Sequence, residues 1–120
     1  MSYSDSLGNA ISPYTLGISP AVSFSAKSAT GPGTALDGLA VRSAAVLVVT
    51  TSAGVSAGSV QLQGSLDNVN WYSLGSAVTT SAASTTTQVV VASAYSRFVR
   101  ANVATAITGG TVAASVGLSG

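Results

Sequence analysis

The sequence predicts an all-β protein: an antiparallel β-sandwich of roughly seven to eight strands, immunoglobulin-like or jelly-roll in topology, with an extended N-terminal arm. Polar and apolar residues alternate with a period of two in several short segments, which is typical of strands with one buried face. Gly, Pro, Asn and Asp separate these segments, and no stretch has a helical period. At 120 residues the chain has the size of one domain, which we assign to residues 21–120.

Residues 1–20 are predicted to form the arm, because Pro13 and Pro20 interrupt a stretch that has no sustained period. Large apolar and aromatic side chains recur along this stretch and need a surface to dock on. We expect that surface to belong to a neighbouring chain or a partner. Docking on the chain's own domain and a frayed terminus are the alternatives. The candidate partner-binding residues of the arm are Tyr3, Leu7, Ile11, Tyr14 and Leu16.

Three segments predict strands in the first half of the domain. Val22 and Phe24 alternate with serines in residues 21–26, and a loop with a Gly-Pro-Gly turn at residues 31–33 follows. Residues 39–42 alternate again. Residues 44–51, AAVLVVTT, are rich in β-branched side chains and would be apolar on both faces of a strand. This predicts a central strand covered on both faces.

Residues 59–75 predict a β-hairpin. One face of its first strand carries Val60, Leu62, Gly64 and Leu66. The turn lies at residues 67–70, because Asp and Asn bond to nearby backbone groups and accept a left-handed φ. The return strand begins at Trp71 and ends at Gly75. Trp71 is expected in the core between the sheets, and Tyr72 points to the opposite face.

The remaining residues predict a loop and three strands. Residues 76–87 form a Ser/Thr/Ala loop, and residues 88–92 form a strand. The next strand has one face with Tyr95, Val99, Ala101 and Val103, and another with Phe98, Arg100 and Asn102. A stacked contact of Arg100 on Phe98 is expected, and Arg97 is assigned to a sheet edge or an interface. After a turn at residues 108–110, the inward residues of the last strand are Val112, Ala114, Val116 and Leu118.

Few residues of this chain can carry out chemistry. It contains no His, Cys or Glu, and only 6% of its residues are charged, against about 25% in ordinary soluble domains. We therefore expect neither an enzyme nor a cofactor or metal site. Asp67, Asn68 and Asn70 offer oxygen atoms to a calcium ion, but one carboxylate and two amides favour a turn.

The low charge also limits the partners. The chain has 4 cationic residues, too few to neutralise many phosphates, so nucleic acid is not an expected partner. No apolar run approaches the ~20 residues of a membrane-spanning helix, and the first ten residues lack the pattern of a signal peptide. A surface with so little charge repulsion favours assembly with copies of itself or with a partner over a monomer.

Three segments resemble parts of discoidin-like and other phage-borne β-sandwich modules. GSLDNVNWYSLG resembles their hairpin pattern G-S-x-D-G-x-x-W-x-x-L, with Asn68 in place of the usual Gly. YSRFVRANV resembles their strand a-R-[YF]-[VI]-R-a, carried by Arg97, Phe98, Val99 and Arg100. GGTVAASVGLSG is similar to their last strand, and the three segments lie within residues 59–120. Carbohydrate-binding modules share the hairpin motif.

Among such modules, the chain most resembles a small virion protein of a tailed phage, in particular a head decoration (capsid-stabilising) protein. Its size, its low charge and its missing secretion signal carry this resemblance. The resemblance implies a non-enzymatic structural protein on the capsid surface of the virion, made in the host cytoplasm. It also implies a homo-oligomer, with a trimer favoured, whose arm binds the major capsid protein.

Two alternatives stay open. The first is a virion-surface glycan-binding or adhesion module with Asn68, Asn70, Trp71 and Tyr72 as candidate ligand contacts. Sugar-binding relatives place aromatic or basic residues on loops at one end of the sandwich. The predicted loops at residues 53–58 and 76–87 contain neither, which favours the decoration protein. The second alternative is a tail-tube or tail-fibre subunit.

Overall fold

The computed structural model of the chain describes residues 3–4, 10–11 and 18–119. No helix occurs among them, and so none that could cross a membrane. The strands of the described residues are β1 (Tyr3–Ser4), β2 (Ala10–Ile11), β3 (Ile18–Lys27), β4 (Gly31–Pro32), β5 (Leu36–Arg42), β6 (Ala44–Thr51), β7 (Ala57–Ser65), β8 (Trp71–Thr79), β9 (Thr86–Val91), β10 (Ser96–Thr108) and β11 (Val112–Ser119).

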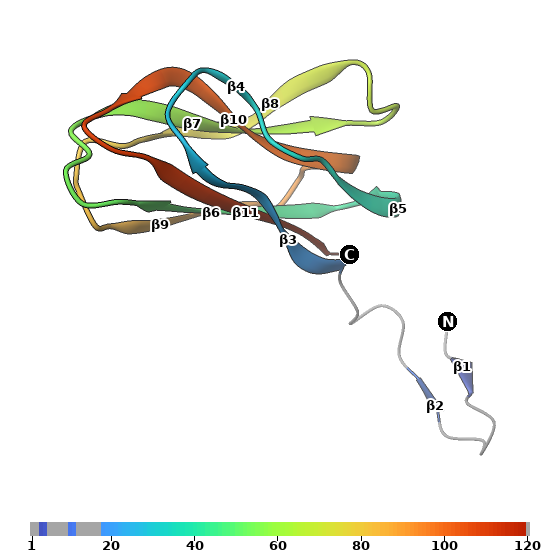
Figure 1. The fold of residues 1–120 in the computed structure, drawn as a ribbon. Helices are drawn as coiled ribbons and strands as arrows, with labels where there is room; N and C mark the ends of the chain where they lie inside the picture. Colours follow the sequence, from blue (N-terminus) through green and yellow to red (C-terminus); the bar gives the residue numbers. More distant parts are fainter. Residues whose placement is uncertain (1–2, 5–9, 12–17, 120) are drawn as a thin grey trace.

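Strands β3 to β11 form a sandwich of two antiparallel sheets, which confirms the predicted fold class (Figure 1). One sheet has the order β4-β10-β7-β8, with β5 also paired to β10. The other has the order β3-β11-β6-β9. These are nine strands in the described part of the chain, one more than the upper end of the predicted range, because the two-residue strand β4 pairs with β10.

The strand order is that of a jelly roll. When the short β4 is left out, eight strands remain from β3 to β11. The first strand in the chain pairs with the last, the second with the last but one, and so on inward: β3 with β11, β5 with β10, β6 with β9, and β7 with β8. The pairs β11–β6 and β10–β7 then join these four ladders into two sheets. This nesting is what folding one long antiparallel hairpin onto itself produces, and it decides between the two predicted topologies.

The core lies between the inner faces of the two sheets, where every second residue of each long strand points. The predicted alternation is confirmed in β11, whose inward side chains Val112, Ala114, Val116 and Leu118 are at most 3% exposed. It is also confirmed in β7 and β10, through Val60, Leu62, Val99, Ala101 and Val103. Most of these side chains are small, so the sheets approach closely. A Cβ on Gly64 would collide with the hydroxyl of Ser96.

Several predictions about individual elements are wrong. The return strand of the hairpin does not end at Gly75 but continues to Thr79, because Gly75 takes a left-handed φ of 67° and the ladder with β7 continues past it. The segment Gly31–Pro32 is a short strand instead of a turn. Leu66 is 57% exposed, because β7 ends at Ser65 and the tip turns away from the core. Tyr95 is 62% exposed, because its φ of 42° and a bulge before Phe98 break the alternation.

The strand β6 has partners on both edges, β11 and β9, as expected of a central strand. Its inner residues Ala45, Leu47 and Val49 are at most 2% exposed. The prediction that both faces are covered is wrong for the described chain, since Val46 and Val48 on the outer face are only half-buried. Its apolar outer face is therefore a surface feature.

The residues assigned to the arm contain two short strands. β1 and β2 pair antiparallel, with Tyr3 opposite Ile11 and Ser4 opposite Ala10. The sandwich itself begins at Ile18, which pairs with Leu118 and so lies within the residues predicted for the arm.

The buried position of Leu62 predicts a large loss of stability on truncation. Leu62 is 0% exposed, so Leu62→Ala should lower the free energy of unfolding by about 2–5 kcal/mol, because it removes buried methyl groups and leaves a cavity. Val69→Ala at the 75% exposed hairpin tip is the control and should change it by less than about 0.5 kcal/mol. Urea unfolding followed by the fluorescence of the single tryptophan measures both, and equal effects would contradict the assigned core.

Candidate functional site

The arm residues predicted to bind a partner are only partly described. Tyr3 and Ile11 lie opposite each other in the β1–β2 ladder. Leu7, Tyr14 and Leu16 lie outside the described residues. The arm enters the sandwich at Ile18, which pairs with Leu118, and Leu118 pairs with Ala45 at the start of β6. The end of the sandwich that receives the arm is therefore the end where β6 begins and β11 finishes.

That same end carries most of the exposed large apolar side chains. The connections β5–β6, β7–β8 and β9–β10 meet there, since Ser96 pairs with Arg42 and the amide of Ala94 donates to the carbonyl of Ser43 at 2.8 Å. Figure 1 shows the β7–β8 turn and the end of β5 on the same side of the sandwich as the start of β3. Six of the eight exposed large hydrophobic residues of the described chain form this apolar end: Leu39, Val41, Leu66, Val69, Tyr72 and Tyr95.

The opposite end of the sandwich has a different surface. Its connections, residues 28–30, 52–56, 80–85 and 109–111, consist of Ser, Ala, Thr, Gly and one valine. That valine, Val55, is 3% exposed. Two turns touch here: a Cβ on Gly109 would collide with the carbonyl oxygen of Gly54. Both glycines take a positive φ. Exposed apolar surface is therefore concentrated at one end of the molecule.

The tip of the β7–β8 hairpin is built around Asp67. Its Oδ1 accepts hydrogen bonds from the amides of Val69 at 2.9 Å and Asn70 at 2.8 Å, and Oδ2 accepts one from Nδ2 of Asn70 at 2.7 Å. The Ser65 hydroxyl also donates to Oδ1 at 3.0 Å. Asn68 takes a φ of 62°, so the left-handed conformation expected from the sequence is confirmed.

These hydrogen bonds explain the electrostatics of Asp67. The amide of Asn70 first, and that of Val69 next, hold the pKa of the Asp67 carboxyl far below its usual value of 3.8. Both carboxylate oxygens are used to shape the turn, as the sequence favoured over a calcium site. Among the described residues, no three His, Cys, Asp or Glu side chains gather as a metal site would need.

The outer face of the five-stranded sheet carries Trp71, which corrects the expected core position. Trp71 pairs with Ser65 and so shares the direction of Gln63 and Gln61, away from the core. Leu74, three residues on and therefore of opposite direction, fills the inner position of β8 and is buried. A period of two predicts that neighbours alternate, but it does not predict which of two aromatic residues faces inward.

Trp71 is part of a cluster that spans three strands. The guanidinium of Arg100 lies over its ring with Cζ 4.0 Å from the centroid, and Nε of Arg100 donates to Oε1 of Gln63 at 2.8 Å. Burial under these neighbours lowers the pKa of Arg100 from its usual value. We call Gln63, Trp71, Phe98 and Arg100 the Trp71 face. Gln63 was not singled out in the sequence, since the cross-strand register that sets it opposite Arg100 is not visible there.

Phe98 has a different arginine from the one expected. Arg97, not Arg100, lies over its ring, with Cζ 5.0 Å from the centroid. Arg97 also binds Asp37 through two hydrogen bonds, Nε to Oδ1 at 3.0 Å and Nη2 to Oδ2 at 3.2 Å. Hydrogen bonding by Arg97 first, and by the Leu39 amide next, lowers the pKa of Asp37. Arg97 belongs to β10, which has β7 on one side and β5 on the other, so the prediction of a sheet-edge position is wrong for Arg97 itself. Only its partner Asp37 lies on the edge strand β5.

The four residues expected to contact a ligand do not converge. Asn68 and Asn70 lie in the tip, and Trp71 lies on the outer face. Tyr72 points the other way, and its hydroxyl shares a hydrogen bond of 2.8 Å with the buried hydroxyl of Ser96. Any sugar contact through Trp71 would therefore use Arg100 and Gln63 as its polar neighbours instead of Asn68, Asn70 and Tyr72.

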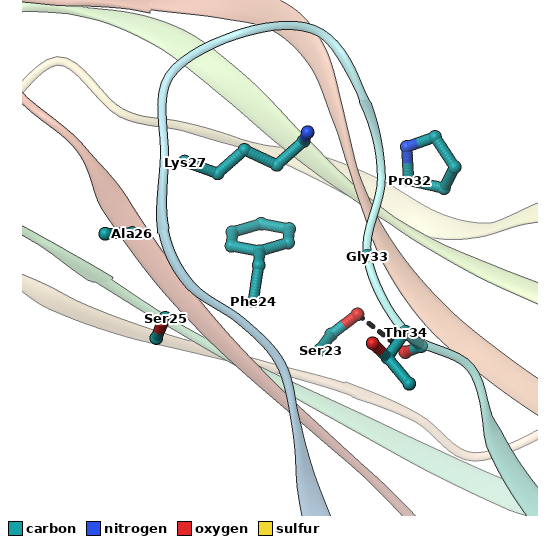
Figure 2. A pocket seen from close by; sticks show the side chains of 8 residues that line it. All are labelled: Ser23, Phe24, Ser25, Ala26, Lys27, Pro32, Gly33 and Thr34. Atoms are coloured by element: carbon teal, nitrogen blue, oxygen red, sulfur yellow. Dashed lines mark hydrogen bonds between the residues drawn. The ribbon is translucent and has the colours of Figure 1, made fainter.

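A hollow lies between β3 and β4, with a volume of about 560 Å³ (Figure 2). Its lining is Ser23, Phe24, Ser25, Ala26, Lys27, Pro32, Gly33 and Thr34. Lys27 is the single ionisable group among these eight residues, and the Ser23 hydroxyl is engaged with the carbonyl of Thr34 at 2.9 Å. The lining therefore offers no pair of groups for proton transfer or nucleophilic attack.

Neither the models of known protein families nor the sequences of curated proteins match this chain.

The Asp67 tip predicts a dependence of stability on pH. Because the folded-state pKa is lowered, the ionised carboxylate adds stability above its usual pKa of 3.8, and this is lost as the pH falls toward the folded-state pKa. Asp67→Asn should therefore lower stability at neutral pH and flatten its decline below about pH 4. Urea unfolding at several pH values measures the stability at neutral pH and its decline in acid, and Asp37→Asn serves as the comparison. An unchanged acid dependence would contradict the assigned role.

Proposed function

We propose that the chain is a non-enzymatic structural protein of a phage virion that decorates and stabilises the capsid by binding the major capsid protein. The observation that carries this proposal is the apolar end, where six exposed large apolar residues lie at the same end of the sandwich as the point at which the arm leaves it. Exposed apolar patches of this kind mark protein interaction sites. The arm and the apolar end can thus bind one partner together.

The distribution of charge supports the same proposal. Asp37 and Arg97 bind each other, Arg100 binds Gln63 and Trp71, and both oxygens of Asp67 are used in its turn. These four charged groups of the sandwich therefore serve its architecture. A protein that binds only an assembled lattice stabilises that lattice by mass action, and this requires a binding surface but no chemistry.

A binding experiment with undecorated phage capsids tests the proposal. The wild-type protein should co-sediment with capsids and show regular density on their surface in negative-stain images. The double variant Leu66→Ser, Val69→Ser should bind at least about tenfold more weakly, because burying each such side chain is worth about 1.5–3 kcal/mol. Val22→Ser, an equally exposed valine away from the apolar end, should bind as the wild type does.

Deletion of residues 1–17 distinguishes the contribution of the arm to capsid binding from that of the apolar end. The variant keeps all of β3, so it should unfold at a urea concentration close to that of the wild type and bind capsids weakly. Wild-type binding after the deletion would contradict a role for the arm. A wild-type protein that ignores capsids would overturn the decoration proposal, and filaments or rings of the purified protein would favour a tail subunit.

A virion-surface glycan-binding module is the second candidate function. The Trp71 face favours it, because an aromatic ring beside an arginine and a side-chain amide is a surface on which a sugar can stack and hydrogen-bond. Wild-type protein should then bind members of a glycan array, and Trp71→Ala should lose this binding while remaining folded. Tyr72→Phe is the control, because its side chain points away from this face. An array without any bound glycan would exclude this candidate.

A further inference from the structure

The open edge of β9 differs from the other edges of the sandwich. Among the described strands, β9 pairs with β6 alone. Its sequence TTQVVV contains no charge, no Pro and no Gly, and its register with β6 runs without a shift. Sheets protect their edges with charges, prolines, bulges or short strands, because an unprotected edge pairs with strands of other chains. β9 has six residues and none of these protections.

Each of the other edge strands carries at least one feature that protects an edge. β3 contains Pro20 and has three register shifts against β11. β8 contains Gly75 with a positive φ and a register shift against β7. On the far edge of that sheet, β4 has two residues including Pro32, and β5 carries Asp37 and Arg42. The contrast makes β9 the edge of the described sandwich that is open to a further strand (Figure 1).

The pairing with β6 shows which backbone groups of β9 face outward. The amide of Thr51 donates to the carbonyl of Thr85 at 2.9 Å, so residue 85 directs its carbonyl toward β6. In an antiparallel ladder the direction alternates along the strand. Residues 87, 89 and 91 therefore bond to β6, and the N–H and C=O groups of Thr86, Gln88 and Val90 point to the open edge. All three of these residues are exposed, Val90 by 65%.

We propose that β9 is a self-association edge, which pairs antiparallel with β9 of a second copy of this chain across a two-fold axis at Gln88. In this register Gln88 lies opposite the Gln88 of the second copy, and Thr86 lies opposite Val90. Each of these pairs exchanges both backbone bonds, which gives about six hydrogen bonds. The two four-stranded sheets then become one continuous eight-stranded sheet with β9 at its centre.

A second copy is the partner that the charge pattern fits. Residues 68–96, which include β9 and both of its connections, contain no charged residue. Two identical edges therefore meet without like-charge repulsion and without burying an unpaired charge. The contact involves a single six-residue strand from each copy, so its area is at the low end for protein interfaces, below about 1,200 Å². The dimer is therefore weak in solution and gains strength where copies are held close together.

This two-fold contact does not depend on capsid binding, so either can fail while the other holds. It is also distinct from the trimer that the resemblance implies, because an isologous contact closes at two copies.

Amide hydrogen exchange of the full chain at low and high protein concentration tests the inference. The amides of Thr86, Gln88 and Val90 should exchange more slowly as the concentration rises, by about tenfold when nine-tenths of the chains are paired. The amides of residues 87, 89 and 91 already bond to β6 and should not change. Protection that is independent of concentration, or that rises at other residues only, overturns the proposal. The same holds if deletion of residues 1–17 abolishes the protection, because the arm would then be the partner strand.

Paired charge variants test the two-fold axis. Gln88→Lys and Gln88→Glu each place like charges opposite each other and should abolish self-association in sedimentation, and an equal mixture of the two should restore it. Ser25→Lys and Ser25→Glu are the controls, because this exposed residue lies on β3 at the opposite edge of the same sheet. Restoration in the mixture also shows that both variants are folded. Wild-type association of either single Gln88 variant overturns the assigned register.

Discussion

Contact between the inner faces of the two sheets is the interaction on which the rest of this structure depends. Val, Ala and Leu side chains fill it, and the close approach requires residues without bulk, such as Gly64 beside Ser96. The nested strand pairing brings both sheets together and gathers the β5–β6, β7–β8 and β9–β10 connections at one end. The apolar end is thus a consequence of the jelly-roll order, because no single segment of the sequence contains all of its residues.

Scarcity of charge shapes the surface in two ways. Most charged side chains of the described strands belong to the five-stranded sheet, where they bind one another, an aromatic ring or a backbone carbonyl. The four-stranded sheet carries Lys27, at the end of β3, as its single charge among the described residues. Hydroxyl and amide groups keep such a surface wet without making copies repel one another. This composition supports the proposed contacts with other proteins.

The alternation of β7, β10 and β11 was predictable because a strand with one buried face imposes a period of two on its own sequence. The same reasoning failed where a local backbone feature interrupts that period. Tyr95 itself takes a positive φ before β10, and Leu66 lies just beyond the last paired residue of β7. The Asp67 turn was predictable because its hydrogen bonds join residues within a few positions of one another. The partners of Arg97 and Arg100 were not, because Asp37 and Gln63 lie far away in the sequence.

The sequence by itself determined the fold class, the hairpin with its Asp67 turn, and the inward residues of β7, β10 and β11, because these depend on patterns within a segment. Only the tertiary structure decided the jelly-roll order, the outward position of Trp71 and the gathering of exposed apolar residues at one end. It also decided that β9 is an edge. Each of these depends on which strands become neighbours and in which register, and that choice is made by the fit of the two sheets around their common core.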